Sequence, residues 1–283
     1  MDRIFYVLQD HRGRGAVIVF AFPFSGGRRR TILCALLNAT MPAPLLALEQ
    51  ICKRFGAITV AERIDLALAP GEALGIIGPN GAGKTTLFGI VSGTVAPDSG
   101  RVLYAGRDIT ALPPAQRCAL GIGRSFQIPQ PFSGMSVFEN LVVAAAFGAG
   151  RREREAYDSC MAILERCALA AKANQLAGSL TLLDRKRLEL ARGLASQPKV
   201  LLLDEVAGGL TEHECRALIA LIGEIRASGV AIVWIEHVVH ALLASIDRLL
   251  VLHNGAFIAD GDPQAVIRDP QVAEIYMGIE ADA

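Results

Sequence analysis

A glycine-rich segment, LGIIGPNGAGKTTLFGIV at residues 74–91, carries residue types that bind phosphate. Gly78, Gly83, Lys84 and Thr85 stand in the GxxxxGK[ST] spacing, after an apolar run and before a helical pattern. The glycines allow a turn whose backbone N–H groups point at phosphate oxygens, and the start of a helix lies behind them. Lys84 would reach the β- and γ-phosphates, and the Thr85 hydroxyl would bind Mg²⁺. The segment therefore predicts a nucleoside triphosphate site.

Two further apolar runs end in side chains suited to hydrolysis. In VLLLDE (200–205), Asp204 and Glu205 emerge at the carboxyl end of an expected strand, where open α/β sheets bind ligands. Asp204 can hold Mg²⁺ through water, and Glu205 can orient or deprotonate an attacking water. VAIVWIEHVVH (230–240) ends its strand in the same way, and His237 there is a candidate sensor of the phosphate, although a histidine at a strand end is usually structural.

The elements that must position these residues begin with a β-rich stretch. Short apolar runs broken by glycine and proline predict strands at LLALEQI, ITVAERIDLAL, ALGIIG and, after the turn PDSG, RVLYAG.

The middle of the chain is expected to be helical. A helix should run over 136–147, because Ser136 and Glu139 form a capping box ahead of an apolar run. A second, amphipathic helix is expected over 151–173. Its packed face would hold Tyr157, Met161, Leu164 and either Cys167 or Ala168.

After Lys199 strands and helices alternate, and Thr211 with Glu214 forms another capping box. This order predicts a parallel sheet covered on both faces.

Composition narrows the function classes. The chain has 283 residues, 52% of them hydrophobic, and a net charge of zero, so its overall charge does not favour nucleic acid as a partner. The six cysteines (34, 52, 118, 160, 167 and 215) form no CxxC pair, which favours reduced thiols over disulfides or zinc. No apolar run reaches the ~20 residues that span a bilayer.

Residues 1–43 differ from the rest and are interpreted as an N-terminal extension. A cluster, GGRRR at 26–30, follows a short apolar run where a signal peptide would have its cleavage site. Two alternatives remain: a disordered arm, or an upstream segment that is not translated because Met41 is the true start.

Over residues 44–278 the chain resembles the ATP-binding subunits of ABC transporters. IGPNGAGKTTL is similar to their Walker A motif, VLLLDE to their Walker B motif, Gln127 in GRSFQIPQPF to their Q-loop, His237 to their switch histidine and Phe55 to the ring that stacks on adenine. The resemblance implies an α/β fold, the P-loop NTPase ABC cassette, over 44–283, with a mixed sheet core, an N-terminal antiparallel β part and a helical subdomain at about 128–182.

The resemblance also implies a set of site residues for ATP and Mg²⁺. ATP would be bound by Phe55, Gly78, Asn80, Gly81, Gly83, Lys84, Thr85, Thr86 and Thr181, and Mg²⁺ by Thr85, Gln127 and Asp204. The catalytic residues would be Glu205, His237 and Gln127.

Within that family, GIGRSFQIPQPFSGMSVFENLVVA and DGDPQAVIRDPQVAEIYMG resemble the branch that energises uptake of branched-chain amino acids and related solutes such as urea or amides. This implies two membrane permease subunits, a second ABC ATPase and, indirectly, a solute-binding protein as partners. It also implies a peripheral location on the cytoplasmic face of the inner (plasma) membrane. The lipopolysaccharide-export branch is the nearest rival.

One motif departs from the family. Counting 24 residues back from Asp204 places LTLLD at the position of the signature loop, commonly LSGGQ. Thr181 preserves the hydroxyl, Leu182 and Leu183 replace both glycines, and Asp184 brings negative charge near an anion. Family members dimerise so that each ATP lies between one chain's P-loop and the other's signature. We therefore expect either a heterodimer with one weakened site or a working variant signature, which also permits a homodimer.

Val206 and Thr211 also depart from the residues that the family usually carries, Pro and Asp or Asn, at the same interface.

Two other functions remain to be weighed against a transport motor. One is a soluble ABC ATPase of DNA repair or translation, and the other is a regulatory cassette that hardly hydrolyses ATP. The first would show two fused cassettes or long coiled-coil insertions, and this chain has one cassette and no heptad run.

Overall fold

The computed structural model describes residues 4–9, 16–21, 43–237, 239–243 and 245–280. The chain divides into Met1–Ala43 and Pro44–Ala283, and each unit is considered by itself. In the first unit, β1 (Ile4–Gln9) pairs antiparallel with β2 (Ala16–Ala21). The GGRRR cluster and Met41 lie outside the described residues.

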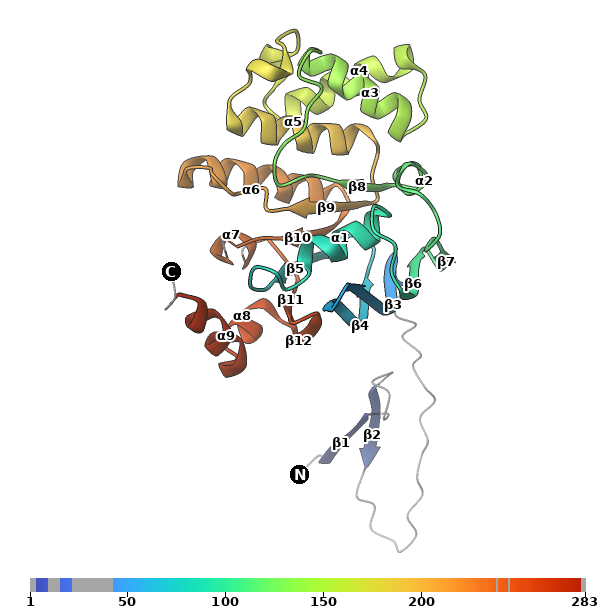
Figure 1. Ribbon diagram of the computed structural model, residues 1–283, viewed down its shortest axis with the longest axis vertical. Coiled ribbons are helices and arrows are strands. Elements are labelled where there is room, and N and C mark those ends of the chain that lie inside the picture. Colours follow the sequence, from blue (N-terminus) through green and yellow to red (C-terminus); the bar gives the residue numbers. More distant parts are fainter. Residues whose placement is uncertain (1–3, 10–15, 22–42, 238, 244, 281–283) are drawn as a thin grey trace, which may run out of the picture. The chain divides into compact units, whose positions relative to one another are not determined.

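The second unit is built on a six-stranded sheet in the order β12-β11-β5-β10-β9-β8 (Figure 1). The strands are β5 (Ala73–Ile77), β8 (Ile122–Arg124), β9 (Val200–Asp204), β10 (Ala231–Ile235), β11 (Arg248–His253) and β12 (Ala256–Gly261). Every pair is parallel except β11 with β12. β5, β9 and β10 are buried at every residue, as expected for parallel strands covered on both faces.

Alternation along the strands divides the core in two. Leu203 and Trp234 point into one cluster. That cluster also holds side chains from α3 (Val137–Gly148), α4 (Glu153–Arg166), α5 (Leu182–Ala195) and α6 (Glu212–Ala227). Leu202 and Val233 point into the other cluster, with α1 (Lys84–Ser92) and the second sheet. Successive side chains of a strand face opposite sides, so each strand contributes to both cores.

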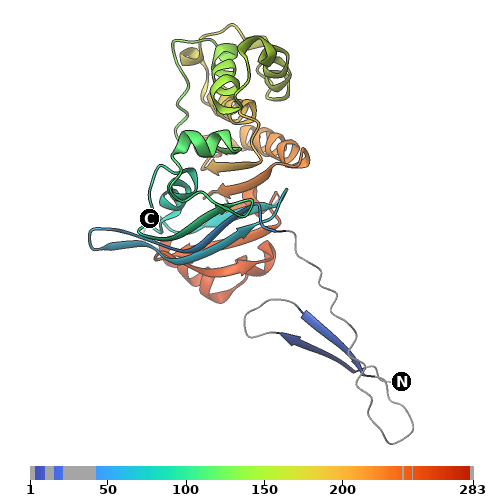
Figure 2. The ribbon, with the colours of Figure 1, turned by 90° about the vertical axis from the view of Figure 1, so that its right-hand side faces the viewer.

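The second sheet is antiparallel, in the order β4-β3-β6-β7, and its two long strands are seen along their length in Figure 2. Its strands are β3 (Leu46–Phe55), β4 (Ile58–Leu68), β6 (Ser99–Tyr104) and β7 (Arg107–Asp108). Phe55 is the last residue of β3, and the short turn to β4 leaves it exposed.

Helices form beyond the β8 edge of the main sheet, where α3, α4 and α5 gather (Figure 1). These elements are α2 (Pro114–Ala119), α3 (Val137–Gly148), α4 (Glu153–Arg166), the 3₁₀ turns Ala170–Lys172 and Ala177–Ser179, and α5 (Leu182–Ala195). The capping box of Ser136 and Glu139 starts α3 one residue after Ser136, as its pattern predicts.

The helix expected over 151–173 is shorter than predicted, because α4 ends at Arg166. Ala168 adopts φ +54°, and the N–H groups of Ala168 and Leu169 donate to the carbonyls of Glu165 and Leu164 at 3.0 and 2.8 Å. These two bonds form a Schellman motif, with buried Leu169 packed near Leu164. Its left-handed residue is usually glycine, so the alanine gave no stop signal in the sequence.

The expected packed face of α4 is also rotated slightly. Ala156, Cys160 and Leu164 are buried, whereas Tyr157 is 38% exposed and meets the Phe138 ring edge-on at 5.3 Å. The tyrosine therefore covers the edge of the core and does not fill it.

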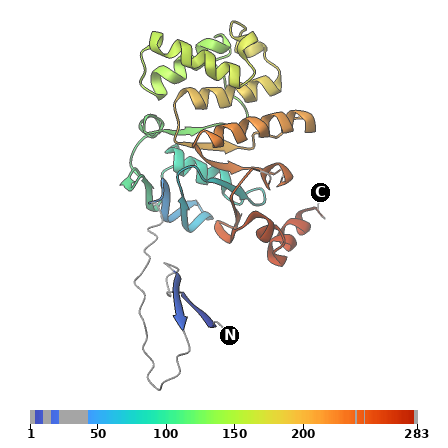
Figure 3. The same ribbon diagram turned by 180° about the vertical axis from the view of Figure 1, so that it is seen from behind.

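The chain ends with α7 (Val239–Leu243), α8 (Pro263–Ile267) and α9 (Pro270–Glu280). In Figure 3, α8 and α9 lie at the end of the cassette away from α3–α5. Among the described residues, no helix is long and apolar enough to cross a membrane. The five described cysteines are free thiols, and Cys34 lies outside the described residues.

Candidate functional site

The glycine-rich loop connects β5 to α1 and is held tightly by its neighbours. Gly83 is the N-cap of α1 at φ +105°. A Cβ at Gly83 would lie 2.2 Å from the carbonyl oxygen of Val60, and one at Gly78 would lie 2.1 Å from that of Leu252. Only glycine fits where two backbones approach this closely, so both glycines are required by the packing as well as by the turn.

Lys84 is almost fully buried and turns back over this loop. Its ammonium donates to the carbonyl oxygens of Gly78 at 2.6 Å and Pro79 at 3.0 Å. Desolvation lowers the pKa of Lys84, and the negative charges of Glu205 and Asp204 oppose that shift. The Lys84 ammonium therefore bonds neutral carbonyl oxygens at a place where an anionic phosphate would attract its charge more strongly.

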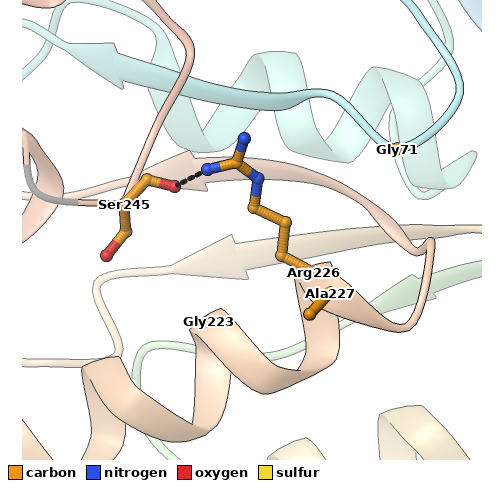
Figure 4. Close-up of a pocket in the computed structure, with 5 residues that line it drawn as sticks. All are labelled: Gly71, Gly223, Arg226, Ala227 and Ser245. Carbon is orange, nitrogen blue, oxygen red and sulfur yellow. Dashed lines mark hydrogen bonds between the residues drawn. The ribbon is translucent and has the colours of Figure 1, made fainter.

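The loop borders a shallow hollow of about 250 Å³ that contains most of the predicted phosphate contacts. Its lining is Val60, Asn80, Gly81, Ala82, Gly83, Lys84, Thr85, Thr86 and Glu205. A larger pocket of about 400 Å³ lies where Arg226 donates to the Ser245 carbonyl (Figure 4). That pocket is at the amino ends of the strands, opposite the edge where open α/β sheets bind ligands, and it holds none of the predicted residues.

The Asp204 carboxylate is buried at the end of β9, 3% exposed. Arg124 Nη2 donates to its Oδ2 at 3.0 Å. Burial raises the pKa of Asp204, while the hydrogen bond and positive charge of Arg124 act against that rise. Sequence reasoning assigned no role to Arg124. The sequence pattern that could have indicated a role for Arg124 is a charged residue at the end of a short strand, because parallel strands end at the edge where Asp204 emerges.

The other two predicted catalytic residues, Gln127 and His237, each contact one oxygen of the Glu205 carboxylate. The Gln127 amide nitrogen donates to Oε2, and His237 Nε2 lies 2.8 Å from Oε1. The Glu205 backbone has φ +46°, a left-handed conformation that costs a residue with a side chain about 1–3 kcal/mol and often marks functional sites. Side chains from two other loops thus converge on the Glu205 carboxylate, which lines the same hollow as the phosphate-binding loop.

A buried lysine and glutamate, neither assigned a role from the sequence, support the backbone around Glu205. Lys186 Nζ lies 3.4 Å from the Glu205 carbonyl oxygen, and desolvation lowers the Lys186 pKa against the pull of Glu236. Glu236 accepts hydrogen bonds from the N–H of Ala207 at 2.6 Å and that of His237 at 3.2 Å. Glu236 therefore ties the segment after Glu205 to the strand end that carries the histidine.

Phe55, the predicted adenine-stacking ring, is half exposed. Lys53 Nζ lies 5.2 Å from the centre of that ring and also forms an ion pair of 2.8 Å with Asp98. A cation above an aromatic face is attracted by it, so Lys53 orients the ring.

The signature position forms a self-contained cap. Thr181 is the N-cap of α5: its hydroxyl oxygen accepts from the Asp184 N–H at 3.3 Å, and its O–H donates to Asp184 Oδ2 at 2.9 Å. Lys172 also donates to Oδ2, and Arg187 lies 3.6 Å from Oδ1. Burial would raise the Asp184 pKa, yet Lys172, Thr181 and Arg187 together hold it below its usual value.

The negative charge that Asp184 brings to the signature is therefore compensated within the chain. The carboxylate is 4% exposed and is neutralised by two cations of the same chain. Its compensation came from Lys172, which the sequence placed in a different helix. Leu182, in contrast, is 45% exposed at the first turn of α5, where a glycine would leave the backbone open.

The two other residues that differ from the family's usual ones at this interface, Val206 and Thr211, make contacts within the chain. Val206 is buried in the core, and the Thr211 hydroxyl donates to Glu214 at 2.7 Å in the capping box that starts α6.

The predicted Mg²⁺ ligands are chemically suitable. Thr85 offers a hydroxyl, Asp204 a carboxylate and Gln127 an amide oxygen, the oxygen donors that Mg²⁺ prefers. Thr85 and Glu205 line the same hollow, and Gln127 touches Glu205. Asp204 ends β9 at the edge of the sheet that carries Glu205, and Arg124 holds its Oδ2.

Comparisons with known proteins agree with this geometry. Residues 61–208 match the profile of the family described as ABC transporter. The chain is 36% identical over 253 residues to the high-affinity branched-chain amino acid transport ATP-binding protein LivG of Escherichia coli, covering 84% of this chain and 99% of LivG. It is 35% identical to the lipopolysaccharide export system ATP-binding protein LptB of Acidithiobacillus ferridurans, covering 83% and 97% of the two chains.

Solved structures agree as well. The crystal structure of the ADP conformation of MJ1267, an ATP-binding cassette of an ABC transporter, superposes with a TM-score of 0.77 at 33% identity, covering 83% of this chain and 99% of that one. The P-loop with its buried lysine, the paired carboxylates and these relatives agree, and the predicted ABC cassette fold is confirmed. The chain belongs to the ABC transporter family as an ATP-binding cassette with ATPase activity.

Proposed function

We propose that this ATPase drives an ABC importer for branched-chain amino acids or related small solutes. The observation that carries the proposal is the similarity to LivG along nearly the whole of that protein. In this role the cassette lies at the cytoplasmic face of the inner membrane, bound to two permease subunits. A solute-binding protein would deliver the solute to them, and nucleic acid has no part.

In the proposed reaction Lys84 leaves the carbonyls of Gly78 and Pro79 for the β- and γ-phosphates. Mg²⁺, held by Thr85, Asp204 and Gln127, would neutralise phosphate charge. Asn80, Gly81 and Thr86, which line the same hollow, contribute backbone or side-chain donors to the phosphates, and Phe55 stacks on the adenine.

Glu205 orients the attacking water and accepts its proton. Gln127 and His237 hold the two oxygens of that carboxylate, so its direction is set before the substrate arrives. Such preorganisation lowers the barrier because the side chains need not reorganise during the reaction.

Coupling to the permeases is expected around the Q-loop. Phe126, Ile128 and Phe132 are 41%, 73% and 46% exposed, an unusual density of apolar side chains at the surface within seven residues. Purification of the full chain from native membranes, followed by identification of its companions, tests the assignment. Permease subunits of an amino-acid importer support it. Companions from lipopolysaccharide export, the function suggested by the LptB similarity, overturn it in favour of that second candidate.

The signature determines how the dimer works. Thr181 keeps the hydroxyl of the family, although that hydroxyl donates to Asp184 in this chain, and α5 keeps backbone N–H groups at its N-terminus. Exposed Leu182 and adjacent Leu183 project side chains where the family usually has glycine. We propose a heterodimer with a second ABC ATPase, in which this chain's P-loop is completed by the partner's signature. A homodimer with a working LTLLD is the alternative.

The ATPase rate of the full chain, measured across protein concentration with Glu205→Gln as the blank, separates these cases. No activity above the blank, with ATP still bound, supports the need for a partner's signature. Activity that rises more steeply than linearly with concentration and disappears in the blank means that homodimers work. A slow rate that a purified second ATPase does not raise would indicate the regulatory cassette.

A further inference from the structure

Arg124 occupies a junction between three parts of the site. It is the last residue of β8, where it pairs opposite Leu202 of β9 and so ends beside Asp204. Its guanidinium donates to Asp204 Oδ2 at 3.0 Å and to the hydroxyl of Ser92, the last residue of α1, at 3.3 Å. Both charged side chains are largely buried, 12% and 4% exposed.

The same guanidinium lies over two aromatic rings. Its Cζ is 5.9 Å from the centre of the Phe88 ring, on α1, and 5.2 Å from the centre of the Phe126 ring. Phe88 stands one helical turn after Lys84, and Phe126 immediately precedes Gln127. One side chain therefore contacts the helix of the P-loop, the predicted metal-binding carboxylate and the start of the Q-loop.

A carboxylate this deeply buried needs a partner, because burying a charge that is neither paired nor hydrogen-bonded is costly, and a donor to one of its two oxygens also fixes its direction. Arg124 takes Oδ2 and leaves the other oxygen of Asp204 for a cation or its bound water. The planar guanidinium is itself restrained by the two rings and by Ser92, so it cannot swing away with the Asp204 side chain.

We propose that Arg124 is a positioning residue for magnesium, holding the Asp204 carboxylate ready for the Mg²⁺ that accompanies ATP and tying it to the Q-loop through Phe126. The inference rests on the proposed magnesium site and extends it to a residue outside the motifs. Arg124 touches neither nucleotide nor metal in this account and acts only through Asp204.

Arg124→Met tests this role because methionine keeps much of the apolar contact and loses the charge and the hydrogen bonds. The readout is the affinity for a fluorescent ATP analogue, measured once in EDTA and once in saturating MgCl₂. We expect Arg124→Met to bind within about threefold of the unchanged protein in EDTA and to lose about tenfold or more of the gain that magnesium provides. Arg124→Lys should recover part of that gain, since the charge returns without the planar fork.

Arg117→Met is the matched control. Arg117 is another buried guanidinium beside α1, 1% exposed, but its hydrogen bonds go to the backbone carbonyls of Ile90, Val91, Thr110 and Leu112. This variant should be less stable and should keep the magnesium-dependent gain.

A gain in Arg124→Met that is unchanged or larger would overturn the inference, and a larger one would mean that Arg124 competes with the metal. Equal loss in Arg117→Met would also overturn it, since any weakened fold would then behave alike. If the unchanged protein shows no magnesium-dependent gain, the proposed magnesium site fails and the inference fails with it. If the unchanged protein shows the magnesium-dependent gain in affinity and Arg124→Met shows the same gain, the magnesium site stands and only the role of Arg124 is overturned.

Discussion

Gly83→Ala probes how closely the phosphate-binding loop is packed against β4. The new Cβ would lie 2.2 Å from the Val60 carbonyl oxygen, whereas such carbon–oxygen contacts are normally about 3.3 Å or longer. Loop and strand must therefore separate by about 1 Å, and a misplacement of about 1 Å at a reacting centre can reduce the rate about 100-fold. The φ of +105° adds a backbone cost of about 1–2 kcal/mol for a residue with a side chain.

Gly106→Ala is the control for that backbone cost. Gly106 has φ +78° in the turn between β6 and β7, and a Cβ there would meet no heavy atom of the described residues within 4 Å. Both variants therefore incur strain, but only Gly83→Ala overlaps a backbone.

The assay is the affinity for a fluorescent ATP analogue together with thermal melting. We expect Gly106→Ala to bind like the unchanged protein with a melting temperature a few degrees lower. Gly83→Ala should lose about 100-fold in affinity, as expected when a displaced loop loses one or two hydrogen bonds to a charged phosphate. Binding by Gly83→Ala within threefold of Gly106→Ala would refute the reasoning, because the loop could then move away from β4 without consequence.

Three further predictions follow from the contacts around the site. Gln127→Ala and His237→Ala should each slow ATP hydrolysis about 10- to 100-fold. Because both side chains act through Glu205, the double variant should lose less than the product of the two single losses. Strictly multiplicative losses in a double-mutant cycle of turnover rates would contradict this shared action. Asp184→Asn should lower the free energy of unfolding at pH 7.5 in urea titrations. Since the pKa of Asp184 is lowered from 3.8 in the folded protein, the difference in free energy between variant and unchanged protein should shrink as the pH falls below 3.8. A difference that does not depend on pH would exclude the ion pairs as its cause. Arg117→Met should lower the free energy of unfolding by at least about 2 kcal/mol in the same titrations, because several buried carbonyls lose their donor, and an unchanged midpoint would show that water replaces it.

Short sequence patterns predicted several of the helix boundaries in the fold. The capping boxes of Ser136 and Thr211 predicted the starts of α3 and α6, because a cap is a contact between residues three apart in the chain. The end of α4 was missed for a related reason: the left-handed residue of its Schellman motif is Ala168, and the usual glycine signal is absent.

The signature shows the limit of reasoning from one motif. Read alone, LTLLD places a negative charge where the family presents donors to phosphate. The charge is compensated because Lys172 and Arg187 reach Asp184, and Lys172 arrives there from a separate turn of the helical region. The exposed leucine is the departure that remains, and it depends on the type of side chain at that position.

The P-loop, the buried strands and the two carboxylates at the end of β9 could be predicted from the sequence, since each depends on residue types at short, fixed spacings. The groups that meet those carboxylates could not be predicted in this way, because they come from distant parts of the chain. Arg124 pairs with Asp204 across 80 residues, and Gln127 and His237 reach Glu205 across 78 and 32. Partners so far apart in the chain are brought together by the parallel pairing of β8, β9 and β10, which aligns the carboxyl ends of these strands at one edge of the sheet.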